Sequence, residues 1–107
     1  MSRLLHVHPQ AAAEAGEAAA WYEAQRAGLG LEFLAAVDHA IDSVQESPML
    51  YPVWRPNHPW RRSVVRRFPY VVFYEVEEER VIVMAVAHAK RHPGYWVTRR
   101  RQTQTPA

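Results

Sequence analysis

The stretch that decides the fold is Val81–Ala87, which has the sequence VIVMAVA and is apolar at every position. A strand with one face in water alternates apolar and polar side chains, whereas a strand covered on both faces is apolar throughout. We therefore predict a central strand over residues 80–88 that is buried on both sides.

Three further strands are predicted around this one. Residues 61–68 and 70–76 carry β-branched and aromatic side chains, and Glu77–Glu79 forms the hairpin connection to the central strand. A short strand is also predicted at residues 3–8. The proline-rich segment Pro48–Pro59 is expected to be an ordered surface loop, because each proline fixes one backbone angle.

The residues between the first strand and this loop favour two helices. Pro9 to about Ala27 is rich in alanine, and proline is tolerated in the first turn of a helix. Gly28–Gly30 then breaks the pattern. The second helix ends at Ser47, and its apolar residues recur at steps of three and four: Leu34, Val37, Ile41 and Val44.

This order of elements predicts an α+β fold, in which an N-terminal strand and a helical hairpin pack on one face of a mainly antiparallel four-stranded sheet. Residues 1–98 are predicted to form one domain, and residues 99–107 a basic flexible tail. The other face of the sheet is expected to be only partly apolar. Arginines from residues 61–68 are expected to lie there and to bind a partner.

Composition excludes several classes of protein. The 107 residues contain no cysteine, which excludes disulfides, thiolate metal sites and cysteine catalysis. Small secreted domains usually depend on disulfides, so we expect a cytoplasmic protein. No apolar run is long enough to span a membrane and no signal peptide is recognisable, so no membrane is expected. We also expect no metal and no cofactor, since His6 and His8 have no carboxylate close by in the sequence and no nucleotide-binding glycine pattern occurs.

Charge is distributed unevenly along the chain. Residues 1–54 hold two arginines and seven acidic residues, a net charge of −5, whereas residues 55–107 hold eleven basic and four acidic residues, a net charge of +7. Such a division favours a basic face that meets nucleic acid or an acidic protein. A solvated surface without a partner is the alternative.

Two arginine pairs lie in the predicted strand 61–68. Because side chains alternate across a strand, Arg62 and Arg66 are expected on one face, and Arg61 and Arg67 on the other. One interpretation is that these residues protect an edge strand from aggregation. The other is a stripe that binds phosphate or carboxylate groups.

A second cluster follows the central strand, in which imidazoles, cations and aromatic rings gather: His88, Lys90, Arg91, His92, Tyr95 and Trp96. Such residues can bind single-stranded nucleic acid. A ribonuclease would need a histidine, His88 or His92, to move protons, and a cation such as Arg66, Arg67 or Lys90 on the phosphate. The alternatives are capping or packing roles for the histidines and a hydrophobic anchor made of Tyr95 and Trp96, which are the commoner roles of such residues.

Several of these stretches occur together in one known family. Arg67–Tyr74 (RFPYVVFY), Ala87–Trp96 (AHAKRHPGYW), Ala20–Glu23 (AWYE) and Gly30–Phe33 (GLEF) resemble the RelE/ParE superfamily of toxins from bacterial type II toxin–antitoxin modules. The resemblance covers roughly residues 3–99. It implies a helical hairpin on an antiparallel sheet, growth inhibition, a role in plasmid stabilisation, and a co-expressed acidic antitoxin.

The resemblance implies two possible activities. RelE-like members cleave messenger RNA on the ribosome, whereas ParE-like members poison DNA gyrase and are not nucleases. This chain matches the ParE-like side better, so we expect a toxin that binds DNA gyrase and forms a hetero-oligomer with its antitoxin. The residues expected to bind antitoxin or target are Arg62, Arg66, Arg67, Lys90, Arg91, His92, Tyr95 and Trp96. The alternative is a RelE-like endoribonuclease, for which the catalytic residues would be His88, Arg67 and Tyr95; whether the protein is an enzyme stays open.

Overall fold

The structure, a computed structural model, describes residues 3–99 and has the predicted α+β arrangement. The four strands form one sheet in the order β1-β4-β3-β2, in which β1 runs parallel to β4 and the other neighbours are antiparallel. Within the described residues no helix is long and apolar enough to cross a membrane. The elements in chain order are β1 (Leu4–Val7), α1 (Pro9–Gln25), α2 (Leu29–Glu46), the 3-10 turn η1 (Pro48–Leu50), β2 (Trp60–Val64), β3 (Tyr70–Val76) and β4 (Arg80–His88).

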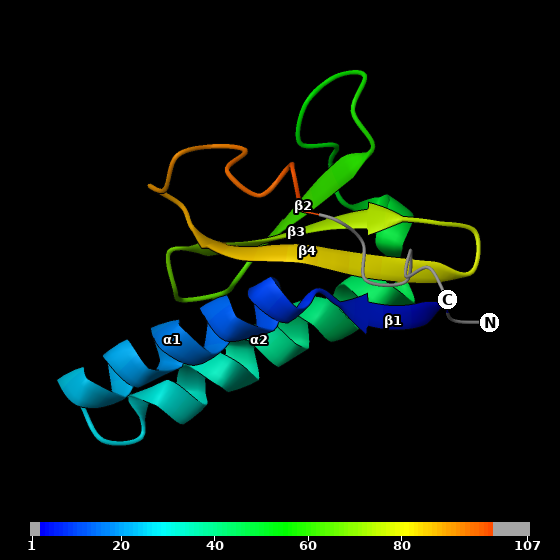
Figure 1. The fold of residues 1–107 in the computed structure, drawn as a ribbon. Helices are drawn as coiled ribbons and strands as arrows, with labels where there is room; N and C mark the ends of the chain where they lie inside the picture. Colours follow the sequence, from blue (N-terminus) through cyan, green and yellow to red (C-terminus); the bar gives the residue numbers. More distant parts are fainter. Residues whose placement is uncertain (1–2, 100–107) are drawn as a thin grey trace, which may run out of the picture.

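Strand β4 is central and covered on both faces, as predicted from its apolar sequence, and every residue of Val81–Ala87 is buried. Figure 1 shows the helical hairpin on one side of the sheet, and the loop before β2 and the segment after β4 on the other. On the helix face, Phe33 and Val44 of α2 belong to one core cluster with Val72 and Val83 of the sheet.

The opposite face, called the outer face below, differs from the prediction. It was expected to be partly apolar and open to a partner, but a second hydrophobic cluster fills it. Trp96 is fully buried there against Phe73, with Trp54 and Trp60 packed around it. The physical reason is that the proline-rich loop and the residues after β4 both bring indole rings onto the sheet, where large aromatic side chains bury the most apolar area.

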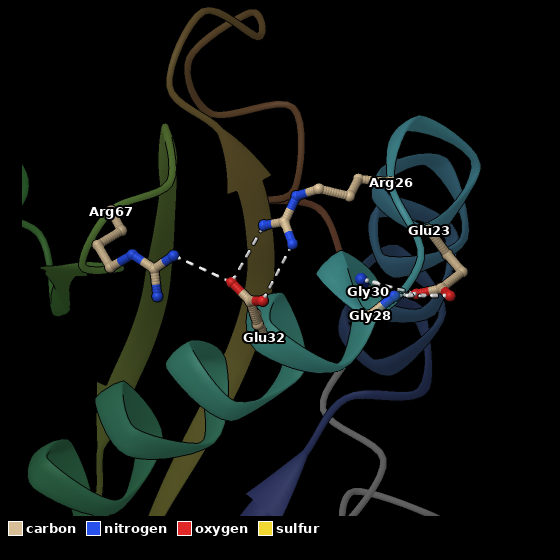
Figure 2. A network of polar contacts seen from close by, with 6 residues as sticks. All are labelled: Glu23, Arg26, Gly28, Gly30, Glu32 and Arg67. Atoms are coloured by element: carbon tan, nitrogen blue, oxygen red, sulfur yellow. Dashed lines mark hydrogen bonds and ion pairs between the residues drawn. The ribbon is translucent and has the colours of Figure 1, made fainter.

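The helical hairpin turns earlier than predicted. Gly28 has a left-handed backbone (φ 89°) and precedes α2, whereas Gly30 lies inside that helix. The carboxylate of Glu23 in α1 accepts hydrogen bonds from the N–H groups of Gly28 (2.9 Å) and Gly30 (3.0 Å), so a side chain of the first helix caps the second (Figure 2). Gly30 is needed for close approach, because a Cβ at this position would lie 2.6 Å from the carbonyl oxygen of Ala19.

Strand β2 is shorter than the predicted strand 61–68, which was wrong for its last four residues. Pairing ends at Val64, and the chain then turns through Arg66 and Arg67. The backbone of Arg67 is left-handed (φ 72°). The N–H of Val65 donates to the carbonyl of Tyr70 at 2.9 Å and closes this turn. Arg66 and Arg67 therefore project from a turn at one end of the sheet, whereas Arg61 and Arg62 lie on β2 as predicted.

Candidate functional site

The C-terminal segment, residues 89–99, returns across the outer face of the sheet. The N–H of Ala89 donates to the carbonyl of Pro69 at 2.8 Å, which joins the start of the segment to the turn before β3. Trp96 then packs on Phe73, with ring centroids 4.8 Å apart. The segment is therefore an integral part of the fold and forms one wall of the site described next.

A pocket of about 180 Å³, called the outer pocket, lies between the C-terminal segment and strands β2 and β3. Its apolar lining includes the rings of Trp54 and Phe73. Its basic lining includes the guanidinium groups of Arg62 and Arg91 and the imidazole of His92. A pocket that combines an apolar lining with cations suits a ligand that is anionic at one point and apolar at another.

The two arginines of the outer pocket are exposed, and no carboxylate within residues 3–99 compensates their charge. Among residues 3–99, neither Arg62 nor Arg91 forms an ion pair with a carboxylate. The guanidinium carbon of Arg91 lies 3.8 Å from the centre of the Tyr95 ring, a cation–π contact that leaves its N–H groups available. Both side chains can therefore bind an anion supplied by another molecule.

A wider cavity of about 540 Å³, called the helix-side cleft, opens between α1 and the ends of β3 and β4. Ala18, Trp21 and Tyr70 contribute apolar surface to it, and Trp21 is 61% exposed. His88 and Arg91 line both this cleft and the outer pocket. The two cavities therefore meet at the C-terminal end of β4.

His88 is oriented by its neighbours at this meeting point. Its Nδ1 accepts a hydrogen bond from the N–H of Lys90 at 3.0 Å, and its ring packs against Tyr70 with centroids 5.1 Å apart. An Nδ1 atom that accepts a hydrogen bond carries no proton, so the neutral ring is protonated at Nε2. In this state His88 offers a hydrogen-bond donor to the site and has no free basic nitrogen.

One buried carboxylate connects α1 to the C-terminal segment. Glu14 accepts hydrogen bonds from both terminal nitrogens of Arg99, at 3.0 and 2.7 Å, from the Tyr95 hydroxyl, and from the N–H of Val86 at 3.0 Å. Arg99 also donates to the carbonyl of Met84 at 2.8 Å. Because Glu14 and Arg99 are both largely buried, this charged pair fixes the C-terminal segment against β4 and α1.

These contacts alter the acidity of the groups involved. Burial raises the pKa of Glu14, but the hydrogen bonds from Arg99, Tyr95 and the Val86 N–H outweigh it and bring the pKa below its usual value. Burial, together with the hydrogen bond to Glu14, raises the pKa of Tyr95 to about 12. At neutral pH Tyr95 is therefore a protonated donor whose hydroxyl is already engaged.

We predict that acid destabilises the protein partly through Glu14. A carboxyl group with a lowered pKa in the folded state contributes stability above its unfolded pKa, near 4.5, and loses that contribution as pH falls through the folded value. The urea midpoint of the wild-type protein should therefore fall below pH 4.5 more steeply than that of Glu14→Gln. Urea unfolding of both proteins between pH 7 and 3 measures this, and a pH-independent difference between them would contradict it.

Comparison with known proteins identifies the family. A family model described as "ParE toxin of type II toxin-antitoxin system, parDE" matches residues 5–93. The chain belongs to the ParE toxin family. The fold is also similar to that of a solved structure titled "Chromosomal ParDE TA system from P. aeruginosa", with a TM-score of 0.72 and 12% sequence identity. The match covers 80% of this chain and 95% of that chain. No curated protein matches the sequence.

The structure brings together some of the residues singled out from the sequence of this ParE-family chain. Arg62, Arg91, His92 and Tyr95 all line the outer pocket, although they come from β2 and the C-terminal segment. Lys90 is exposed beside them without being part of the lining. The cations that line the outer pocket of this ParE-family protein therefore come from positions about 30 residues apart in sequence.

Other predicted site residues lie elsewhere. Arg66 is exposed in the turn before β3, and the guanidinium of Arg67 binds Glu32 at 3.0 Å (Figure 2). Arg26 contacts the same carboxylate at 3.4 Å, so Glu32 compensates both cations. Trp96 is fully buried and cannot touch a partner directly. The prediction that these arginines form a single stripe was therefore wrong.

Sequence reasoning missed Glu14 and Arg99, the charged pair that fixes this ParE-family site. Arg99 was assigned to the flexible tail, but its guanidinium is buried against Glu14; residues 100–107 lie outside the described part of the chain. The signal for Glu14 was its position: it lies three residues after Ala11 and four before Ala18, both buried, so it shares the apolar face of α1. A lone acid on such a face requires a partner.

Proposed function

We propose that this ParE-family protein is a cytoplasmic toxin that acts by docking on a macromolecular target, DNA gyrase, and that an acidic antitoxin neutralises it by forming a hetero-oligomer. The observation that carries the proposal is a pair of exposed guanidinium groups, Arg62 and Arg91, beside the apolar lining of the outer pocket. Neither group has an ion pair within the described residues. Arginine next to apolar surface is the combination that dominates binding energy at protein interfaces.

The antitoxin is expected to occupy both cavities. The helix-side cleft, lined by Ala18, Trp21 and Tyr70, fits the apolar face of an amphipathic segment. Arg91 stands where the cleft meets the outer pocket, so a carboxylate that follows the apolar segment would reach it. An acidic segment that is disordered until it binds could cover both cavities at once.

Three features favour docking over RelE-like cleavage of messenger RNA. The Tyr95 hydroxyl donates to Glu14, and burial with this bond raises the pKa of Tyr95 to about 12. Arg67 is paired with Glu32, and His88 accepts a hydrogen bond at Nδ1. Each residue of the proposed catalytic trio is therefore already engaged, and Arg67 does not line the outer pocket. General acid–base catalysis needs groups that are free to exchange protons with the substrate.

We predict that expression of the wild-type protein arrests growth, with loss of plasmid supercoiling and without cleavage of messenger RNA. Arg62→Ala combined with Arg91→Ala should relieve the arrest, because both cations of the outer pocket are lost. Arg26→Ala is the matched control, since Arg26 pairs with Glu32 away from both cavities. Growth curves, gel analysis of plasmid topoisomers and primer extension on messenger RNA after induction measure the three effects.

The same experiment separates the alternatives. Growth arrest with normal supercoiling and cut messenger RNA would contradict docking on gyrase and favour the ribonuclease. Growth that is unaffected by the wild-type protein would contradict both activities. An arrest that the double arginine substitution leaves unchanged would remove the outer pocket from the proposal. Co-expression with the product of an adjacent acidic reading frame should restore growth if that product is the antitoxin.

A further inference from the structure

Glu14 is a largely buried charged group that also lines the helix-side cleft. It lies on α1, whereas the groups that bind it lie on β4 and in the C-terminal segment, so its contacts join parts of the chain more than 70 residues apart. Burying a carboxylate is costly unless it is paired and hydrogen-bonded, and Glu14 receives four such bonds. A simple packing role at this position would be met by an apolar side chain at lower cost.

The contacts continue from Glu14 to the functional surface. The Tyr95 hydroxyl donates to Glu14, which fixes one end of the Tyr95 ring. The face of the same ring carries the guanidinium of Arg91 at 3.8 Å. A guanidinium at this distance from an aromatic face is attracted by the ring and follows its orientation. The position of the Arg91 guanidinium therefore depends on the hydrogen bond between the Tyr95 hydroxyl and Glu14.

Arg91 is the cation for which this matters most. It lines both the outer pocket and the helix-side cleft, and no carboxylate among residues 3–99 pairs with it. A long exposed side chain without a partner samples many rotamers, and fixing it on binding costs free energy. The Tyr95 ring removes part of this cost before the partner arrives.

We propose that Glu14 is a positioning residue, which acts through the Tyr95 hydroxyl to place the Arg91 guanidinium where the two cavities meet. Arg99 completes the arrangement, because it neutralises Glu14 and lies 5.2 Å from the same ring. The consequence for binding rests on the proposed docking function, whereas the placement of Arg91 does not.

The placement can be measured without a partner. Protons of a side chain that lies over an aromatic ring are shifted upfield in the NMR spectrum by the ring current. The δ and ε protons of Arg91 should show this shift in the wild-type protein and lose most of it in Glu14→Gln. The amide nitrogen of the glutamine is a hydrogen-bond donor, and it would face the donors that bind the carboxylate in the wild-type protein. Tyr95→Phe should cause the same loss, since it keeps the ring and removes only the hydroxyl. Glu46→Gln, an exposed acid on α2 that lines neither cavity, should leave the shift unchanged.

A double-substitution cycle distinguishes positioning from a general loss of stability. Glu14→Gln combined with Tyr95→Phe should reduce the Arg91 shift no further than either change alone, because both break the same bond. If Glu14→Gln does not fold, Tyr95→Phe still decides the question. An Arg91 shift that persists in folded Tyr95→Phe or Glu14→Gln overturns the proposal, as does an equal loss in Glu46→Gln.

The growth assay tests the consequence for docking separately. Glu14→Gln should weaken growth arrest, and adding it to Arg91→Ala should weaken the arrest no further, since its effect passes through Arg91. Additive losses would overturn the role in docking. Absence of arrest with the wild-type protein would count against the proposed function alone, because the NMR shifts decide the placement of Arg91 independently.

Discussion

Replacing Trp96 with alanine is expected to lower the free energy of unfolding by about 3–5 kcal/mol. The indole ring is fully buried on the outer face, where it stacks on Phe73 and lies 5.1–5.2 Å, between ring centroids, from Trp54 and Trp60. Its removal leaves a cavity that these rigid rings cannot close by small shifts. Urea unfolding followed by circular dichroism measures the loss.

Trp21→Ala is the matched control for this prediction. Trp21 is the same residue type, but it is 61% exposed on α1 and belongs to neither core cluster. Its replacement should change the free energy of unfolding by no more than about 0.5 kcal/mol, as is usual for surface positions. Equal losses in the two variants would show that Trp96 is not part of the core.

Gly30→Ala is expected to lower the free energy of unfolding by about 1–3 kcal/mol, which is typical of overpacking. Helix propensity alone predicts the opposite, since alanine stabilises a helix interior relative to glycine by roughly 0.5–1 kcal/mol. The added Cβ would lie 2.6 Å from the Ala19 carbonyl oxygen and 3.0 Å from the Glu23 carboxylate. A backbone oxygen can move only if α1 and α2 separate, so the clash outweighs the gain in propensity.

Gly16→Ala provides the internal comparison. Gly16 is also helical, but a Cβ there meets no atom within 4 Å. This substitution should therefore raise the free energy of unfolding by roughly 0.5–1 kcal/mol. Opposite signs at the two glycines, measured by urea unfolding under the same conditions, are the expected result; a stabilised Gly30→Ala variant would contradict the close helix contact.

The elements that the sequence predicted well are those whose side chains repeat with a clear period. The apolar run Val81–Ala87 indicated a strand buried on both faces, and Val37, Ile41 and Val44 indicated a helix with one buried side. The predicted strand over residues 61–68 was too long because alternation continues through a turn, and the period does not show that Arg67 has a positive φ. The break between the two helices was predicted too late in the chain, because glycine has a low helix propensity and Gly30 was therefore assigned to the break. In the structure Gly30 lies inside α2, where its lack of a side chain allows close contact with Ala19.

The site was predictable only in part. The cluster of cations and aromatic rings after the central strand indicated the region, and Arg62, Arg91 and His92 do line one pocket. The contacts of Glu14 with Arg99 join positions 85 residues apart, and no local pattern contains such a pairing. The pairing of Arg67 with Glu32 spans 35 residues and was invisible for the same reason. Long-range polar contacts are set by the tertiary fold, so charge counts along the sequence did not show which arginines stay uncompensated.

The position of β4 at the centre of the sheet has a consequence for synthesis on the ribosome. Two of the three strand pairings involve β4, and its partner β1 lies 76 residues earlier in the chain, from Leu4 to Arg80. Before β4 leaves the exit tunnel, the nascent polypeptide can form the helical hairpin and the β2–β3 pair, but no complete sheet. Such distant pairing also slows folding. A translation product that stops before β4 therefore cannot complete the sheet, and one that stops just before Arg99 leaves Glu14 without its counter-ion.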